Sequence, residues 1–137
     1  MTTTNDTTTT TDLYRRREDL VLRHVAGEND RDLEAIMATF TRARYEIVPT
    51  GAVFDGDEAV RGMILQQWQD MPRLRFDAAA VFHGPTGVVV ETRTTLPGTS
   101  LNMLSMNLFV FEGDGLVNER CYFDQGLMAA QLASALG

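Results

Sequence analysis

Hydrophobic residues in the first half of the chain recur every three or four positions, which is the spacing of one face of a helix. This pattern predicts helices over residues 13–28, 33–40 and 57–71, and the third ends before Pro72. Asp12 is the predicted N-cap of the first helix. Between the second and third helices, residues 44–48 have the composition of a short strand.

From Leu74 onward the hydrophobic positions alternate with a period of two, which is typical of half-buried strands. Asp124 is then the predicted cap of a last short helix. Helices segregated from an antiparallel sheet indicate an α+β fold, in which a strongly curved sheet closed by helices forms a cone around a pocket. The four strands of this half are predicted over residues 74–83, 88–96, 101–112 and 116–123.

Composition limits the classes of partner. The chain has 137 residues and 44% hydrophobic residues, which fits one domain over residues 12–137 behind a disordered, threonine-rich tail over residues 1–11. The net charge of -7 argues against nucleic acid, and no apolar run is long enough to span a membrane. Cys121 is the single cysteine, so we expect a cytoplasmic protein without disulfides. The sequence also leads us to expect no metal site and no cofactor.

His24 is the first candidate for chemistry because it lies in the apolar stripe of the first helix. A neutral imidazole on such a face can polarise a carbonyl group or accept a proton near neutral pH. The alternative is a histidine of the core that is hydrogen bonded to a neighbouring group. Both interpretations stay open on the sequence alone.

Glu91 and Arg93 lie two residues apart on one predicted strand, so their side chains share a face. The run Val88–Val90 predicts that this strand is buried on both faces or nearly so. A carboxylate partly removed from water there is suited to proton transfer. The alternative is an ion pair between Glu91 and Arg93 or a group on a neighbouring strand.

Glu119 and Cys121 share one face of the last strand, so if Cys121 faces the pocket, Glu119 does too. Cys121 lacks an obvious base beside it, so we treat it as a lining residue. Asp124 is either a helix cap or an acidic group of the site. The residues expected to contact substrate are Tyr45, Val48, Trp68, Arg93 and Cys121.

Five short segments carry a family resemblance: residues 24–29 (HVAGEN), Asp32-Leu33, residues 56–60, residues 109–114 and residues 119–124 (ERCYFD), the last running on to Gln131-Leu132. Together they resemble the NTF2-like superfamily over roughly residues 13 to 136, and the last segment is most similar to the SnoaL-like branch. This superfamily includes ketosteroid isomerases, limonene epoxide hydrolases and SnoaL-like polyketide cyclases. The resemblance implies the cone-shaped fold, and this fold hosts many functions.

The sequence departs from these relatives at positions that carry their chemistry. The resemblance places Val48 where isomerases have a catalytic carboxylate, and His24 where they have a tyrosine that binds the oxyanion. Of the aspartate–arginine–aspartate triad of the epoxide hydrolases, only Arg93 remains, because Cys121 and a residue near Thr95 replace the aspartates. Asp124 is the nearest match to the acidic residue of SnoaL-like cyclases.

The leading hypothesis is a cofactor-free, SnoaL-like enzyme that removes a proton next to the carbonyl group of a small, mostly apolar compound, as a cyclase, isomerase or lyase does. Its catalytic residues would be His24 and one carboxylate among Glu91, Glu119 and Asp124. The alternatives are a module that binds a hydrophobic ligand or a partner without chemistry, and an epoxide hydrolase with altered acids. We also expect a homodimer that forms through the outer face of the sheet, with Tyr122, Phe109 or Phe111 at the interface.

Overall fold

The computed structural model describes residues 2–136, and the side chains of residues 10–133. Two helices, α1 (Thr2–Asp30) and α2 (Leu33–Ala38), precede the sheet. The strands β1 (Arg44–Ile47) and β2 (Ala52–Asp55) lead into α3 (Asp57–Asp70). The rest of the chain consists of β3 (Arg75–Gly84), β4 (Gly87–Thr95), β5 (Asn102–Glu112), β6 (Gly115–Tyr122) and α4 (Gln125–Leu136).

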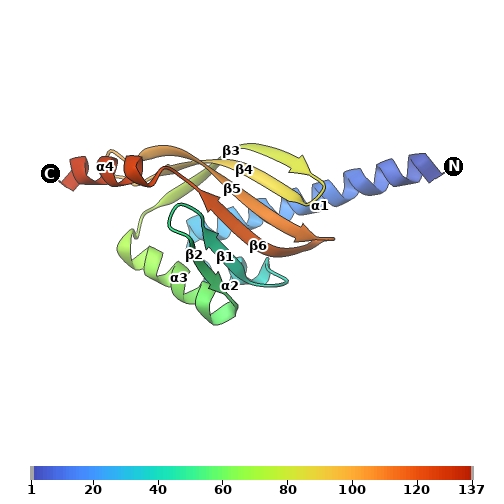
Figure 1. Ribbon diagram of the computed structural model, residues 1–137, viewed down its shortest axis with the longest axis horizontal. Helices are drawn as coiled ribbons and strands as arrows, with labels where there is room; N and C mark the ends of the chain where they lie inside the picture. The colour runs from blue at the N-terminus through green and yellow to red at the C-terminus, as the bar shows by residue number, and fades with distance from the viewer. Residues whose placement is uncertain (1, 137) are drawn as a thin grey trace.

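All six strands form one sheet in the order β2-β1-β6-β5-β4-β3. Neighbouring strands are antiparallel except β1 and β6, which run parallel. In Figure 1, α1 runs beneath β3, β4 and β5, and α3 lies beside β1 and β2. The predicted α+β class is therefore confirmed, and the sheet is mixed rather than purely antiparallel.

The core lies between α1, α2, α3 and the face of the sheet that they cover. Along β5, alternate side chains are buried, as the period of two predicted, and Phe109 is among the most buried of them. On α1 the buried face includes Arg17, Val21, His24 and Val25. The helical stripe predicted over residues 13–28 is thus the face that packs against the sheet.

The N-terminal boundary of α1 differs from the prediction. α1 begins at Thr2 rather than near Leu13, and Asp12 lies inside the helix, where its carboxylate is 3.3 Å from Arg15. Once the packed part of a helix has formed, each further residue closes a hydrogen bond without a new nucleation step. The helix can therefore continue through the threonine-rich segment that was predicted to be disordered, of which Met1 lies outside the described residues.

The strand over residues 88–96 was predicted to be buried on both faces, and this is wrong for its second half. Val88, Val90, Thr92 and Thr94 are buried, whereas Arg93 is exposed. The helices cover one face of the sheet, so the other face of β4 stays accessible. Phe109 and Phe111 belong to the covered face and are buried in the core, which contradicts their predicted place at an interface between protomers.

Among the described residues, no helix is both long and apolar enough to cross a membrane.

Candidate functional site

A cavity of about 170 Å³ lies between α3, α4 and the covered face of the sheet. This is close to the volume, roughly 150 Å³, of an engineered apolar cavity that holds benzene. Most of the wall is apolar, and four of its side chains are methionines, which adapt to ligands of different shape. The lining residues are Tyr45, Ile47, Met63, Gln67, Met71, Leu74, Phe76, Thr94, Met103, Ser105, Asn107, Cys121, Phe123 and Met128.

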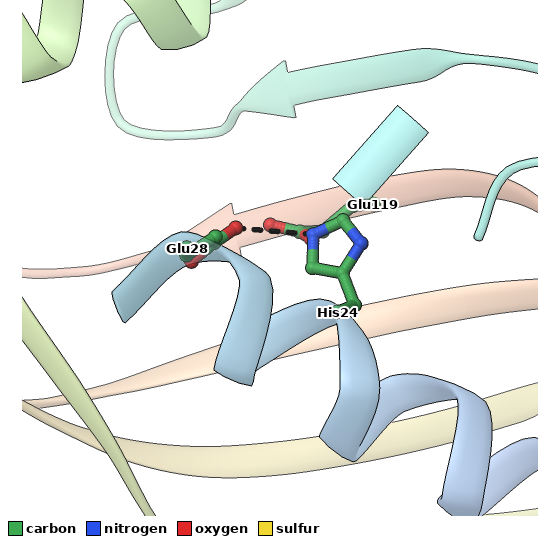
Figure 2. A group of neighbouring side chains, drawn as sticks. All are labelled: His24, Glu28 and Glu119. Carbon is green, nitrogen blue, oxygen red and sulfur yellow. Dashed lines mark hydrogen bonds and ion pairs between the residues drawn. The ribbon is translucent and has the colours of Figure 1, made fainter. Parts of the chain in front are cut away.

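A buried group of ionisable side chains lies behind one wall of this cavity. Glu28 follows His24 by one helical turn of α1, and Glu119 comes from the middle of β6. Figure 2 shows both carboxylates close to the imidazole of His24. His24 Nε2 is 3.0 Å from Glu28 Oε1 and 2.9 Å from Glu119 Oε1. The exposed fractions of the side chains are 1% for His24, 0% for Glu119 and 12% for Glu28.

Thr39 fixes the proton on the other nitrogen of the ring. The Thr39 hydroxyl donates its hydrogen to the carbonyl oxygen of Ile36 at 2.6 Å. Its oxygen must therefore accept the 2.8 Å hydrogen bond from His24 Nδ1. Because Nδ1 carries a hydrogen, Nε2 faces the two carboxylates either with a lone pair or as part of an imidazolium.

The charges around His24 favour the imidazolium. Burial alone lowers the pKa of His24, but the Glu119 carboxylate, followed by Glu28, outweighs burial and raises the pKa to about 10. Burial raises the pKa of Glu28, and the negative charge of Glu119 adds to this, although the hydrogen bond with His24 opposes it. The Nε2–H group of His24 can donate to Glu28, and neither oxygen of Glu119 accepts a hydrogen bond of good geometry from the described residues.

Tyr45 connects this group to the cavity. The parallel pairing of β1 with β6 places Tyr45 opposite Glu119 and Ile47 opposite Cys121. Burial, followed by the nearby charge of Glu119, raises the pKa of Tyr45 well above its usual value. Tyr45 is therefore a neutral phenol at pH 7, and it lines the cavity in front of the buried carboxylate.

Cys121 also lines the cavity, as predicted, and its thiol is 3.4 Å from the Asn107 amide oxygen. Burial, followed by the charge of Glu119, raises the pKa of the Cys121 thiol to about 12. A thiol with that pKa is protonated at neutral pH and is a poor nucleophile. The placement is consistent with a lining residue.

The structure places His24 and Glu119 together, but it does not place His24 in the cavity wall. The ring packs edge-on against Phe40 and Phe109, with centroid distances of 5.4 Å to both. His24, a predicted catalytic residue, is therefore a buried histidine of the core behind the cavity wall. Tyr45 occupies the position between the buried group and the cavity.

Glu91 and Arg93 project from the outer face of the sheet, so they lie outside the cavity. Arg93 donates a hydrogen bond to Asn102 on β5. Glu91 lines a shallow outer depression that also includes Tyr122 and Asp124. Glu91, a predicted catalytic carboxylate, and Arg93, a predicted substrate contact, are therefore not among the residues that line the cavity, because the helices cover the opposite face of the sheet.

Asp124 caps α4, since its carboxylate accepts the backbone hydrogen bond of Leu127 at 2.9 Å. Two other residues expected to contact substrate lie outside the cavity wall. Val48 is half-buried just after β1 and donates its backbone hydrogen bond to Cys121. Trp68 packs in the core cluster of α2 and α3, with the Arg31 guanidinium 5.8 Å from its ring centre.

Glu28, Thr39 and Asn107 were missed by the sequence reasoning. The spacing of His24 and Glu28, four residues apart on one helix, was a usable signal, because such residues are neighbours on the helix surface. The ligand atoms of His24, Glu28 and Glu119 lie within 4.8 Å of one another and could hold a metal ion. The sequence-based expectation of no metal site overlooked this spacing.

Comparison with known structures gives matches across most of the chain. Bal32a, from a soil-derived mobile gene cassette, is 16% identical and superposes with a TM-score of 0.74, over 86% of this chain and 96% of its own. A protein with a ketosteroid isomerase-like fold from Catenulispora acidiphila DSM 44928, solved with trimethylamine, is 15% identical, with a TM-score of 0.72 over 83% and 92% of the two chains.

TerC, co-crystallised with polyporic acid, is 16% identical and superposes with a TM-score of 0.74, over 86% of this chain and 98% of its own. At these identities the matches establish the fold alone. No curated protein matches the sequence. The model of the SnoaL-like domain family matches residues 21–120, which include His24, Tyr45 and Glu119. The chain therefore belongs to the SnoaL-like domain family of the NTF2-like superfamily.

Proposed function

We propose that this protein is a cofactor-free enzyme that removes a proton next to the carbonyl group of a small, mostly apolar compound about the size of one ring. The observation that carries the proposal is the position of Tyr45, between an apolar cavity and a fully buried carboxylate. The complexes of two structural neighbours with polyporic acid and trimethylamine are consistent with a fold that accommodates small molecules.

In the proposed reaction, Glu119 is the final proton acceptor and Tyr45 is the relay. The phenol oxygen of Tyr45 takes the proton from the carbon next to the carbonyl while its own hydrogen passes to the Glu119 carboxylate. The electron pair of the broken C–H bond forms an enolate. Return of a proton to the same or another carbon regenerates Tyr45 and Glu119, so no other reactant is consumed.

The enolate oxygen requires a hydrogen-bond donor in a site from which water is largely excluded. Asn107 provides an amide in the cavity wall, where its oxygen already accepts from the Cys121 thiol. The His24 imidazolium stabilises the negative charge of Glu119 between turnovers from a distance of 2.9 Å. His24 is thus a positioning residue, and Tyr45, Glu119 and Asn107 are the catalytic ones.

The test is hydrogen–deuterium exchange of single-ring ketones in D₂O, followed by NMR at the carbon next to the carbonyl group. We expect exchange above the buffer rate, and a loss of about 100-fold or more in Tyr45→Phe, because the phenol takes part in every proton transfer. The matched control is Tyr14→Phe, since Tyr14 stacks on His83 at the far end of α1 and is outside the cavity. Equal rates in the two variants would contradict the proposal.

A second candidate is a protein that binds a small hydrophobic ligand without chemistry. The observation in its favour is that neither a carboxylate nor an imidazole is among the cavity-lining residues of the described chain. Ketones that bind in the cavity but exchange no proton would identify this second function. Binding is measured by the change in fluorescence of Trp68, which lies on α3 and packs against a core cluster that includes the cavity-lining Tyr45.

A further inference from the structure

We propose that His24, Glu28 and Glu119 form a binding site for one divalent first-row transition metal ion. The three side chains come from two elements, α1 and β6, and their ligand atoms lie within 4.8 Å of one another (Figure 2). A nitrogen ligand with two carboxylate oxygens suits ions such as Zn²⁺ and Mn²⁺. The inference does not rest on the proposed reaction, because metal binding is measured without a substrate.

The hydrogen bonds around the His24 ring favour an ion between the ring and the two carboxylates. Thr39 holds the hydrogen on Nδ1, so the Nε2 lone pair of a neutral ring faces the two carboxylates. A proton on Nε2 makes one hydrogen bond, to Glu28. Glu119 is fully buried, and among the described residues no hydrogen bond of good geometry reaches either of its oxygens, although the His24 ring nitrogen is 2.9 Å away and the Tyr45 phenol is near. One metal ion in place of that proton would engage all three side chains at once.

The distances fit the coordination of such an ion. Two ligand atoms about 2.1 Å from one metal at a right angle lie about 3.0 Å apart. The measured separations from His24 Nε2 are 3.0 Å to Glu28 Oε1 and 2.9 Å to Glu119 Oε1. Both values match neighbouring ligand pairs of an octahedral ion, and the ligand atoms of all three side chains lie within 4.8 Å of one another, so the side chains need little movement to bind it.

The surroundings of the cluster provide two further features of a metal site. A histidine ligand normally donates its other ring hydrogen to an oxygen that fixes its orientation, and Thr39 does this for His24. Glu28 is the partly exposed member, with 12% of its side chain accessible, and gives an ion a route from solvent. An ion bound here would be coordinated by Glu119, whose carboxylate would then be unavailable as a proton acceptor. The metal-free form is therefore the one expected to catalyse the proposed reaction.

The experiment titrates the EDTA-treated chain with Zn²⁺ and, separately, Mn²⁺ by calorimetry in two buffers of different ionisation enthalpy. We expect one ion per chain with a Kd in the micromolar range or below, and release of close to one proton at pH 7 as the ion displaces the hydrogen on Nε2. Glu119→Gln and Glu28→Gln keep the side-chain shape and should each weaken binding by about 100-fold or more, since loss of an orienting neighbour alone costs about 10- to 100-fold.

The matched control is Glu18→Gln, because Glu18 pairs with the second histidine, His83, at 2.8 Å on the surface. This variant should bind the ions as the wild type does. Thr39→Val should weaken binding without removing a ligand, which tests the orienting role of the hydroxyl separately. Binding weaker than millimolar by the wild type, or equal affinities of Glu119→Gln, Glu28→Gln and the control, would overturn the site. Circular dichroism checks that each variant is folded, and either glutamine variant suffices if the other does not fold.

Discussion

The strongest prediction concerns the energetic coupling between His24 and Glu119. The perturbation is the pair of substitutions His24→Leu and Glu119→Leu, made singly and together in the metal-free chain. Both side chains are buried, and the ring nitrogen and the carboxylate oxygen are 2.9 Å apart. Leucine fills much of either space without a charge, so the double variant replaces a buried ion pair by an apolar contact.

The magnitude follows from what each substitution leaves behind. His24→Leu leaves two buried carboxylates without a cation, and breaking a buried pair in this way costs about 3–5 kcal/mol of unfolding free energy. Glu119→Leu should cost less, because His24 keeps its hydrogen bond to Glu28 at 3.0 Å. The double variant removes the fully buried Glu119 together with His24, and only the partly exposed Glu28 is left without its partner. Apolar replacement of a buried pair is often neutral or stabilising by about 1–4 kcal/mol, so the double variant should regain much of the stability that His24→Leu loses.

The assay is urea unfolding at pH 7 with EDTA, followed by the fluorescence of Trp68, the single tryptophan. We expect the double variant to be more stable than His24→Leu by about 2 kcal/mol or more, which indicates strong coupling. The control cycle uses His83→Leu and Glu18→Leu, a surface pair that should couple by less than about 1 kcal/mol. Losses in the buried cycle that add within about 0.5 kcal/mol would refute the reasoning.

Three further predictions concern pH, packing and assembly. The pKa of His24 rises from 6.5 in the unfolded chain to about 10 in the folded chain, so its contribution to stability is fully present below pH 6.5 and is lost as pH rises through 10. The urea midpoint of the EDTA-treated chain should therefore fall between pH 7 and pH 9.5. A rise in the midpoint over this range would contradict the charge assigned to His24. Gly87→Ala should lower the free energy of unfolding by about 1–3 kcal/mol or more, because the added Cβ would lie 2.1 Å from a backbone oxygen of β5. The control Gly84→Ala places its Cβ in open space and should change the urea midpoint little. The homodimer remains a prediction. Because Met106 and Tyr122 are exposed on the outer face of the sheet, the double variant Met106→Lys, Tyr122→Lys should be a monomer by analytical ultracentrifugation. A wild-type chain that sediments as a monomer would disprove the homodimer.

The elements with strong periodicity could be predicted from the sequence. The stripe with His24 and the alternating pattern of β5 arise from burial of one face, and burial leaves a direct record in residue type. β2 was missed because Ala52–Asp55 is too short for a pattern to emerge. The parallel pairing of β1 with β6 could not be derived either, since it joins segments more than 70 residues apart.

The candidate site was predicted only in part, because local patterns record burial but not the pairing of distant segments. The apolar stripe identified His24, and the alternation of β6 placed Glu119 and Cys121 on one face. Which carboxylate meets the ring depends on strand order and on the face that the helices cover, so Glu91 and Asp124 were indistinguishable from Glu119 by sequence. The position of Tyr45 depends on the β1–β6 register, which no local pattern specifies.

The most direct test of the central claim is a crystal structure of the chain with a bound single-ring ketone such as 2-cyclohexenone. The account predicts that the ring occupies the cavity between α3 and the sheet, with the carbon next to the carbonyl group facing the Tyr45 hydroxyl and the oxygen near the Asn107 amide. A ketone that instead contacts the imidazole of His24 directly, or that binds outside this cavity, would contradict it.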